Sequence, residues 1–334
     1  MSAAFKRVVF DRKLKVYGVT WNMHGKPPPA DLSILVPADK YDIVAVGTEE
    51  CERTIAKSFL KQSKSSWESS LCTCLGDGYV MLASHALVAI HIVVFIRKEL
   101  RPFCQSIQTA HVATGIANRL GNKGGVAVSF NFAATSMMFM AIHLAAHQHA
   151  VAERNAQWLR IESLLPLPQA RKVQVGLLEK VKHSHSLASH RFDRCFILGD
   201  LNYRIEGTRK VVDVLLQSGL HEVLLANDQL LRARKEDGIF ANFSEAPIKF
   251  MPTYKFDLHS DEYDSSEKAR IPAFTDRILY RPEKHIRCLS YDSIQSLRTS
   301  DHRPVAAEFE MAFDLGDLTK LKDGRWGSKM CSIL

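Results

Sequence analysis

A short apolar run that stops at a glycine gives the strongest fold signal in this chain. Residues 195–198 predict a buried strand, and Gly199 ends it just before Asp200 and Asn202. An extended or tightly turned backbone at this point brings the Asp200 and Asn202 side chains into one small volume. Taken alone, the segment is also typical of a turn rich in Asp and Asn. Other strands end in the same way, and this favours a functional site.

Two earlier segments repeat the pattern of an apolar strand followed by oxygen-bearing side chains. Residues 14–21 predict a strand that ends at Asn22, and residues 41–47 predict one that leads to Glu49 and Glu50. Amide and carboxylate oxygens are ligands that Mg²⁺ accepts. Each residue alone could equally be a capping residue or a surface acid. Their matching positions indicate a common site at one end of the strands.

The remaining elements predict an α/β fold, a two-layer β-sandwich flanked by helices. Further strands are expected at residues 79–95 (two strands), 125–132, 136–143, 248–250, 278–280 and 305–309. Helical spacing after His149 predicts a helix that Pro166 ends, and residues 211–231 predict helix with a break near Gly219. Residues 51–75 predict a surface helix and loop, and residues 167–190 a surface excursion.

Length and composition suit one large domain. The 334 residues are 46% apolar, and no long Pro, Gly or Ser tract divides them. We expect a catalytic domain over residues 1–313 and a basic tail over residues 314–334. Seven scattered cysteines predict reduced thiols, the charged N-terminal residues do not resemble a secretion signal, and residues 87–96 are too short to span a membrane. The net charge of +8 favours an anionic partner: nucleic acid, a membrane surface or a phosphorylated metabolite.

Eight short blocks occur in a characteristic order: residues 20–25, 46–50, 121–125, 142–147, 199–205, 252–255, 268–277 and 300–304. Together they resemble the inositol polyphosphate 5-phosphatases, within the superfamily of DNase I and the abasic-site endonucleases. The resemblance covers residues 14–309. Residues 254–257, 261–265 and 275–277 and the tail are most similar to the prenylated type IV branch of that family.

The resemblance implies a magnesium site and a set of catalytic residues. Asn22 and Glu50 would bind Mg²⁺, and Glu49, which stands where the family pattern has glutamine, would add a negative charge beside it. The catalytic set would be Asp200, Asn202, His302, Asp276, His143 and Asp301.

Each catalytic residue has an implied role. Asp200 would orient the attacking water, Asn202 would stabilise the transition state, and His143 would contact the scissile phosphate. Asp276 would raise the pKa of His302 and fix its tautomer, and Asp301 would support the site.

Substrate selection is expected from cationic and aromatic side chains. By resemblance, four residues grip the 4-phosphate of an inositol ring: Tyr254, Lys255, Lys268 and Arg270. Tyr203 and Arg204 are expected to touch the ring or its phosphates. Lys123, in a glycine-rich loop that could also be a simple hairpin, is expected to approach phosphate closely.

Three other interpretations compete with this one. His143, His147 and His149 could form a zinc cluster, but no acidic third ligand accompanies them, and we expect His147 and His149 to be structural. A nuclease of the same superfamily is the main alternative function. A catalytically dead lipid-binding module is the other, although the ligand set is complete.

The last four residues, Cys331 to Leu334, fit a prenylation signal that favours a geranylgeranyl group, with basic residues before them. The sequence therefore predicts a phosphoric monoester hydrolase that acts on phosphoinositide lipids by in-line attack of water, without a covalent intermediate. We expect a cytoplasmic monomer, peripheral on a Golgi, plasma or ciliary membrane, that does not bind nucleic acid.

Overall fold

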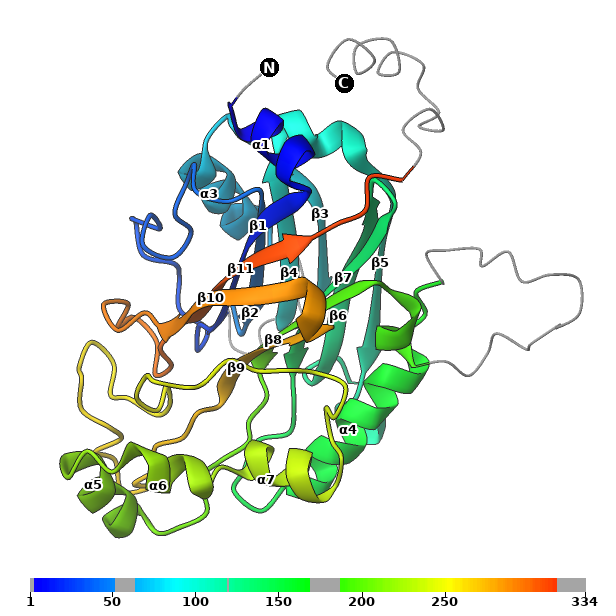
Figure 1. Ribbon diagram of the computed structural model, residues 1–334. Coiled ribbons are helices and arrows are strands. Elements are labelled where there is room, and N and C mark those ends of the chain that lie inside the picture. Colours follow the sequence, from blue (N-terminus) through cyan, green and yellow to red (C-terminus); the bar gives the residue numbers. More distant parts are fainter. Residues whose placement is uncertain (1–2, 52–63, 119, 169–186, 317–334) are drawn as a thin grey trace, which may run out of the picture.

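The computed structural model describes residues 3–51, 64–118, 120–168 and 187–316 and consists of two packed β-sheets with helices around them (Figure 1). The six-stranded sheet has the order β10 (Ile286–Ser293), β11 (Val305–Ala312), β1 (Lys13–Asn22), β2 (Ile43–Glu49), β4 (Ile90–Arg97) and β3 (Tyr79–Leu87). The five-stranded sheet has the order β5 (Cys104–Ala113), β6 (Gly124–Phe132), β7 (Thr135–His143), β8 (Arg194–Asp200) and β9 (Asp276–Arg281). This confirms the predicted sandwich.

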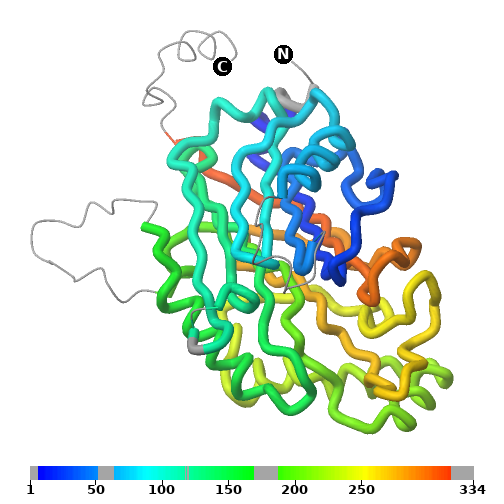
Figure 2. The backbone as a smooth tube through the Cα atoms, turned by 180° about the vertical axis from the view of Figure 1, so that it is seen from behind, coloured from blue at the N-terminus to red at the C-terminus, as the bar shows by residue number. Residues whose placement is uncertain are grey.

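Helices cover the outer faces of both sheets. α3 (Ser65–Leu75) packs on the six-stranded sheet, and α4 (Val151–Leu164) packs on the five-stranded sheet. Seen from behind, they lie on opposite sides of the strands (Figure 2). The other helices are α1 (Ala3–Asp11), α5 (Arg209–Gln217), α6 (His221–Ala226) and α7 (Gln229–Glu236), and the short 3-10 helices are η1 (Lys98–Phe103), η2 (Ile116–Asn118), η3 (Ala188–Arg191) and η4 (Glu283–His285). Among the described residues, no helix combines the length and apolarity needed to cross a bilayer.

The central strands are buried on both faces, which explains why their sequences read as continuous apolar runs. β2, β7 and β8 are buried along their whole length, and β1 is buried from Val16 onwards. Each sheet contains one parallel pair, β1 with β2 and β7 with β8. These two pairs place four strand ends on the same edge of the sandwich.

The sheets approach closely beneath that edge because two glycines face a leucine. A Cβ atom at Gly18 would lie 2.9 Å from Leu198 Cδ2, and one at Gly47 would lie 3.2 Å from Leu198 Cδ1. Gly18 and Gly47 belong to adjacent strands of one sheet, and Leu198 belongs to the other. Gly47 would also meet the Ala141 side chain at 3.2 Å. The spacing of the two sheets here leaves no room for an added methyl group without a shift.

Most predicted elements are confirmed, but one predicted strand is absent, and helix α1 was not predicted. Residues 248–250 do not form a strand: Ile248 and Phe250 are buried, yet the segment lies in an irregular stretch between Pro247 and Pro252. Proline restricts the residue before it and cannot donate to a sheet, so the buried side chains pack without strand pairing. Strands β5 and β10 were not predicted. The tail from residue 317, including Cys331, and residues 52–63 and 169–186 lie outside the described residues.

Candidate active site

Asp200 lies at the centre of a buried polar cluster at the common strand edge. It ends β8, where it pairs with His143 of β7 and Asp276 of β9. Its Oδ2 atom accepts a hydrogen bond from Asn22 Nδ2 at 3.0 Å, across the two sheets. Gly199 has φ of 155°, and a Cβ atom there would lie 2.0 Å from the Ile142 carbonyl oxygen. Only glycine therefore delivers Asp200 in this position.

His302 and Asp276 form the predicted carboxylate–imidazole pair. His302 Nδ1 lies 2.9 Å from Asp276 Oδ2 and 3.2 Å from Oδ1, and both side chains are buried. Burial acts to lower the pKa of His302, but the Asp276 carboxylate outweighs it and the pKa rises to about 10. His302 is therefore an imidazolium at neutral pH.

Hydroxyl groups hold this pair in place. Thr253 Oγ1 and Thr275 Oγ1 donate to Asp276 Oδ2 at 2.6 Å and 2.9 Å. The Trp21 indole donates to the His302 carbonyl oxygen at 3.2 Å, from the strand that ends at Asn22. The pair is thus tied to both sheets, as a site that must keep its geometry requires.

Three atoms of the cluster converge from distant parts of the chain. Asp200, Asp276 and His302 each place one nitrogen or oxygen atom within 4.8 Å of the others. Burial acts to raise the pKa of Asp200, but the hydrogen bond from His143 and the charges of His302 and Lys123 hold it well below its usual range. Asp200 is therefore a carboxylate, able to accept a proton or orient water.

Lys123 and His143 form a second pair beside Asp200. Lys123 Nζ lies 2.5 Å from His143 Nε2, which in turn lies 3.4 Å from Asp200 Oδ2. Burial lowers the pKa of Lys123 to about 8, against the opposing charge of Asp200. Burial and the Lys123 charge lower the pKa of His143. Its Nδ1 atom is buried and has no hydrogen-bond partner among the described residues.

Asn202 sits in a left-handed turn after β8, with φ of 57°. Its backbone N–H donates to Asp200 Oδ1 at 3.0 Å, and its amide nitrogen donates to the Leu144 carbonyl oxygen at 3.1 Å. Arg204 Nη2 donates to Asn202 Oδ1 at 2.5 Å. Asp200 is therefore contacted by the backbone of Asn202, whereas the Asn202 side chain bonds to Leu144 and Arg204.

The charge and donors of the cluster fit a divalent cation. Glu49 is fully buried, and its Oε1 atom has no hydrogen-bond partner among the residues described. Burial, together with the charges of Asp200 and Asp276, raises the pKa of Glu49 well above its ordinary value. Glu50 lies near enough to raise the pKa values of Lys123 and His143. Such a group of carboxylates is the environment that a hard cation stabilises.

Asn22 is less open to a ligand than the sequence suggests, because the His24 N–H donates to its Oδ1 atom at 3.0 Å. An amide oxygen has two lone pairs, so one remains for a cation. Asp301 is buried beside the cluster, where its Oδ1 atom lies 3.3 Å from His24 Nδ1, and its charge raises the pKa of His302. Asp301 thus contributes negative charge beside His302, and its supporting role in catalysis stays a prediction. Sequence reasoning did not single out His24.

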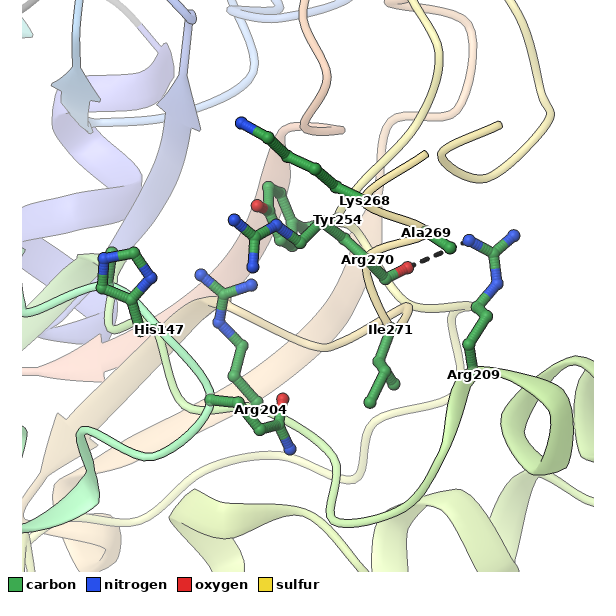
Figure 3. Close-up of a pocket in the computed structure, with 10 residues that line it drawn as sticks. His147, Arg204, Arg209, Tyr254, Lys268, Ala269, Arg270 and Ile271 are labelled. Carbon is green, nitrogen blue, oxygen red and sulfur yellow. Dashed lines mark hydrogen bonds between the residues drawn. The ribbon is translucent and has the colours of Figure 1, made fainter. Parts of the chain in front are cut away.

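A cationic cavity of about 350 Å³ adjoins the cluster (Figure 3). Its wall includes four predicted substrate-binding residues: Arg204, Tyr254, Lys268 and Arg270. The Arg204 guanidinium lies over the Tyr254 ring, 4.4 Å from its centroid. The Tyr254 ring is 4.5 Å from the His302 ring. The cavity is thus joined directly to the catalytic pair.

Three predicted substrate-binding residues do not line this cavity: Tyr203, Lys255 and Lys123, the last of which lies beside His143. The Tyr203 side chain is fully buried under α4, where its hydroxyl donates to Asn155 Oδ1 at 2.7 Å, so its predicted contact with the substrate is wrong. Lys255 Nζ instead pairs with Asp264 Oδ1 at 3.0 Å. The left-handed turn at Asn202 reverses the direction of the chain before Tyr203 and explains the first difference.

The cavity also contains two residues that sequence reasoning did not assign to it. His147 is exposed on the cavity wall, and its ring is stacked on that of His149, 5.9 Å away. The expectation that His147 is structural stays a prediction. Arg209, the first residue of α5, is the other. Its position in sequence gave no signal, because an arginine at a helix start usually faces solvent.

The two packed sheets and the buried carboxylate–imidazole cluster at their common edge define a class of proteins, those with an endonuclease/exonuclease/phosphatase fold. Residues 19–308 match the family described as Endonuclease/Exonuclease/phosphatase family 2. The chain belongs to this family.

Comparison with known proteins narrows the position within the family. The chain is 36% identical over 312 residues to phosphatidylinositol polyphosphate 5-phosphatase type IV of Homo sapiens, covering 90% of this chain and 46% of that protein. It is 34% identical to Synaptojanin-1 of Homo sapiens, over 80% of this chain and 18% of that protein. The chain therefore spans about half the length or less of the curated relatives it matches.

Solved structures agree with the fold. The inositol polyphosphate 5-phosphatase domain of SPsynaptojanin, in complex with inositol (1,4)-bisphosphate and calcium ion, matches with a TM-score of 0.76 and 29% identity, covering 100% of this chain and 98% of that one. Cimex nitrophorin matches with a TM-score of 0.71 at 23% identity, covering 90% of this chain and 99% of that one. The nitrophorin likeness shows the fold alone.

Proposed function

We propose that the chain is a magnesium-dependent phosphoinositide 5-phosphatase that removes the 5-phosphate of an inositol lipid carrying a 4-phosphate. The observation that carries the proposal is the junction of a cationic cavity with the buried Asp276–His302 pair through Tyr254. The cationic and aromatic side chains of this half-open cavity suit a further phosphate on an inositol ring, a group that a nuclease substrate does not carry. The names of the relatives and the inositol bisphosphate in the similar solved structure support the same substrate class.

The protonation states of the cluster suit in-line attack of water on a phosphate monoester. Asp200, kept ionised, accepts a hydrogen bond from the water and orients it for attack. His302, kept protonated by Asp276, donates a hydrogen bond to a phosphoryl oxygen where negative charge accumulates. Lys123 contributes a second positive charge on the other side of Asp200. No side chain needs to form a covalent bond to phosphorus.

Asn22 and Glu50 would hold Mg²⁺ next to Asp200, with Glu49 behind them. When bound, the ion would neutralise charge on the scissile phosphate. Magnesium is proposed on the donor chemistry, since amide and carboxylate oxygens suit it and leave positions for water and phosphate.

The experiment that tests the function is phosphate release from a panel of inositol lipids and soluble inositol phosphates, with and without Mg²⁺. We expect Mg²⁺-dependent release from substrates with a 5-phosphate and none after Asp200→Ala. A DNA-nicking assay runs beside it. Nicking without release of inositol-bound phosphate would contradict the proposal and favour the nuclease.

We also propose peripheral attachment to a membrane, on the sequence pattern of the tail alone. A prenyl group on Cys331 with the preceding Lys and Arg residues would supply two membrane signals. Fractionation of cells that express the chain and Cys331→Ser provides the test. Equal membrane fractions for both would contradict it.

A further inference from the structure

We propose that Arg209 is a positioning residue that sets the shape of the cationic cavity and thereby the preference for a 4-phosphate. This inference rests on the proposed function and deepens it. Arg209 lines the cavity, but its guanidinium is committed to the protein. It therefore acts on the substrate indirectly, through the loop over residues 263–270 that carries Lys268 and Arg270.

The contacts of Arg209 all reach one loop or its own helix. Nη1 donates to the carbonyl oxygens of Asp264 at 2.7 Å and Arg270 at 3.1 Å, and Nη2 donates to that of Tyr263 at 3.2 Å. Nε faces both carboxylate oxygens of Asp213, at 2.7 Å and 2.9 Å, one turn along α5. The bond to the Arg270 carbonyl is drawn in Figure 3. A planar fork of donors is required to hold three carbonyls at once.

The loop over residues 263–270 has no helix or strand. Among the described residues, its backbone is bonded to the segment before it only near its start, where Tyr263 bridges to Phe256 and the Asp264 N–H donates to the Lys255 carbonyl oxygen at 2.8 Å, so side-chain bonds hold much of the rest. It is closed from inside by Asp264, whose buried carboxylate accepts from Ser266 Oγ at 2.7 Å, from the Arg270 N–H at 2.8 Å and from Lys255 Nζ at 3.0 Å. Burial opposes ionisation, but these donors lower the pKa of Asp264 to about 2. Asp264 and Arg209 therefore fix the loop from its two sides.

The same loop presents the cations that face the substrate. Lys268 is exposed and Arg270 half-buried on the cavity wall, and both surround Tyr254 together with Arg204 (Figure 3). Several positive charges in one cavity repel one another when no anion is bound. The loop would relax outwards if the hydrogen bonds that Arg209 donates to its three carbonyl oxygens were lost. Binding of the 4-phosphate should then weaken more than the chemistry at the 5-phosphate.

The test compares Arg209→Met and Arg209→Lys with the matched control Arg232→Met. Arg232 forms the same kind of pair one turn along a helix, with Glu236 at 3.6 Å, and is half exposed on α7. Steady-state kinetics use soluble inositol phosphates that carry a 5-phosphate, with or without a 4-phosphate. Binding of inositol (1,4)-bisphosphate is measured by calorimetry.

We expect Arg209→Met to raise KM about tenfold or more on the substrate with a 4-phosphate, with kcat within about threefold. On the substrate without a 4-phosphate, KM should change by less than about threefold. Arg209→Lys should resemble Arg209→Met, because an ammonium keeps the charge but cannot hold three carbonyls. Arg232→Met should behave as wild type.

Equal losses on both substrates, or full rescue by Arg209→Lys, would overturn the inference. If Arg209→Met fails to fold, Asp213→Asn keeps the test open, because it removes only the carboxylate that orients Arg209, and a selective rise in KM is again expected. Failure of the inference about Arg209 can be distinguished from failure of the proposed function. In the first case the wild type is active and only the selective effect of the variants is missing. In the second case, the wild type itself releases no phosphate from any inositol phosphate.

Discussion

The Arg204 guanidinium stacks on the Tyr254 ring at 4.4 Å and donates to Asn202 Oδ1 at 2.5 Å. Tyr254 in turn lies against His302, so a continuous line of contacts joins Asn202 to the catalytic imidazolium through the cavity wall. A group that binds in the cavity therefore contacts Arg204 and Tyr254, which in turn contact Asn202 and His302. Substrate binding and catalysis are expected to depend on the same side chains.

Arg204→Lys should lower kcat/KM for the proposed substrate about 10- to 100-fold, because an ammonium can neither stack in the same way nor hold Asn202. The measurement is steady-state kinetics of phosphate release. Arg298→Lys, at an exposed pair with Asp261, is the control and should be silent. Wild-type kinetics for Arg204→Lys would contradict the assigned contact.

Asp276→Asn should move the alkaline limb of the pH–rate profile. With Asp276 present, His302 stays protonated up to about pH 10, and the stability it contributes is complete below its unfolded pKa and lost as the pH rises through 10. Without the Asp276 carboxylate, the weaker effects of Asp200 and Asp301 are left to oppose the effect of burial, and the pKa of His302 falls. At pH 7.5, kcat should fall about 10²- to 10⁴-fold and recover partly on acidification.

The pKa of His302 can be followed by NMR in the wild type and in Asp276→Asn. Asp292→Asn, at an exposed position of β10, should leave both the profile and the titration unchanged. An unshifted alkaline limb in Asp276→Asn would show that His302 is not the group responsible.

Lys123→Met should make the protein more stable at pH 7 and less active. The lowered pKa of Lys123, about 8, means that the folded state loses this proton before the unfolded state does. The cost of holding the charged amine is present below pH 8 and disappears as the pH rises towards its ordinary value. Urea midpoints at pH 7 and pH 10 should show a variant advantage that shrinks with pH. An activity equal to wild type would refute the role of Lys123.

Chelation should abolish activity, and Asn22→Ala should raise the Mg²⁺ concentration for half-maximal activity about 10- to 100-fold. Asn22 bonds to Asp200 and offers one remaining lone pair, so its loss affects both the cation and the carboxylate. The exposed Asn242→Ala is the control. Activity that survives a chelator would exclude the proposed metal dependence.

A buried ion network beneath the site should dominate local stability. Arg277 is fully buried and pairs with Asp228 at 3.0 Å and with Glu245 at 2.6 Å. Arg277→Met should cost about 3–5 kcal/mol in urea unfolding, because it leaves two buried carboxylates unpaired. Arg287→Met removes a pair with Glu310 in which Arg287 is 71% exposed, and should cost about 0–1 kcal/mol. Similar costs for both would contradict the network.

The central strands were predictable because both their faces are buried, and an uninterrupted apolar run leaves little choice of structure. β5 and β10 escaped because they are edge strands with many exposed polar residues. Asp200, His302 and Asp276 could be named from short blocks of sequence. Tyr203, in the same block as Asp200, was misplaced, since one left-handed residue decides which way the next side chain points.

The cavity wall was harder to predict than the catalytic cluster for a physical reason. The predicted catalytic residues Asp200 and His143 stand at the ends of strands, so the arrangement of the sheet fixes their positions. Arg209 and His147 reach the cavity from a helix start and a loop, and only the folded chain brings them to Tyr254. The residues next to Arg209 and His147 in the sequence therefore do not indicate that these two side chains line the same cavity.

The alignment of the reacting groups is set by the thickness of the core. Asn22 stands on one sheet and Asp200 on the other, and Gly18, Gly47 and Leu198 beneath them fix how near the sheets come. One added methyl group at Gly18 would contact Leu198 and push the two sheets apart. A substitution at Gly18 or Gly47 can thus change the distance between Asn22 and Asp200 and reduce activity, although it touches no reacting group and the protein still folds.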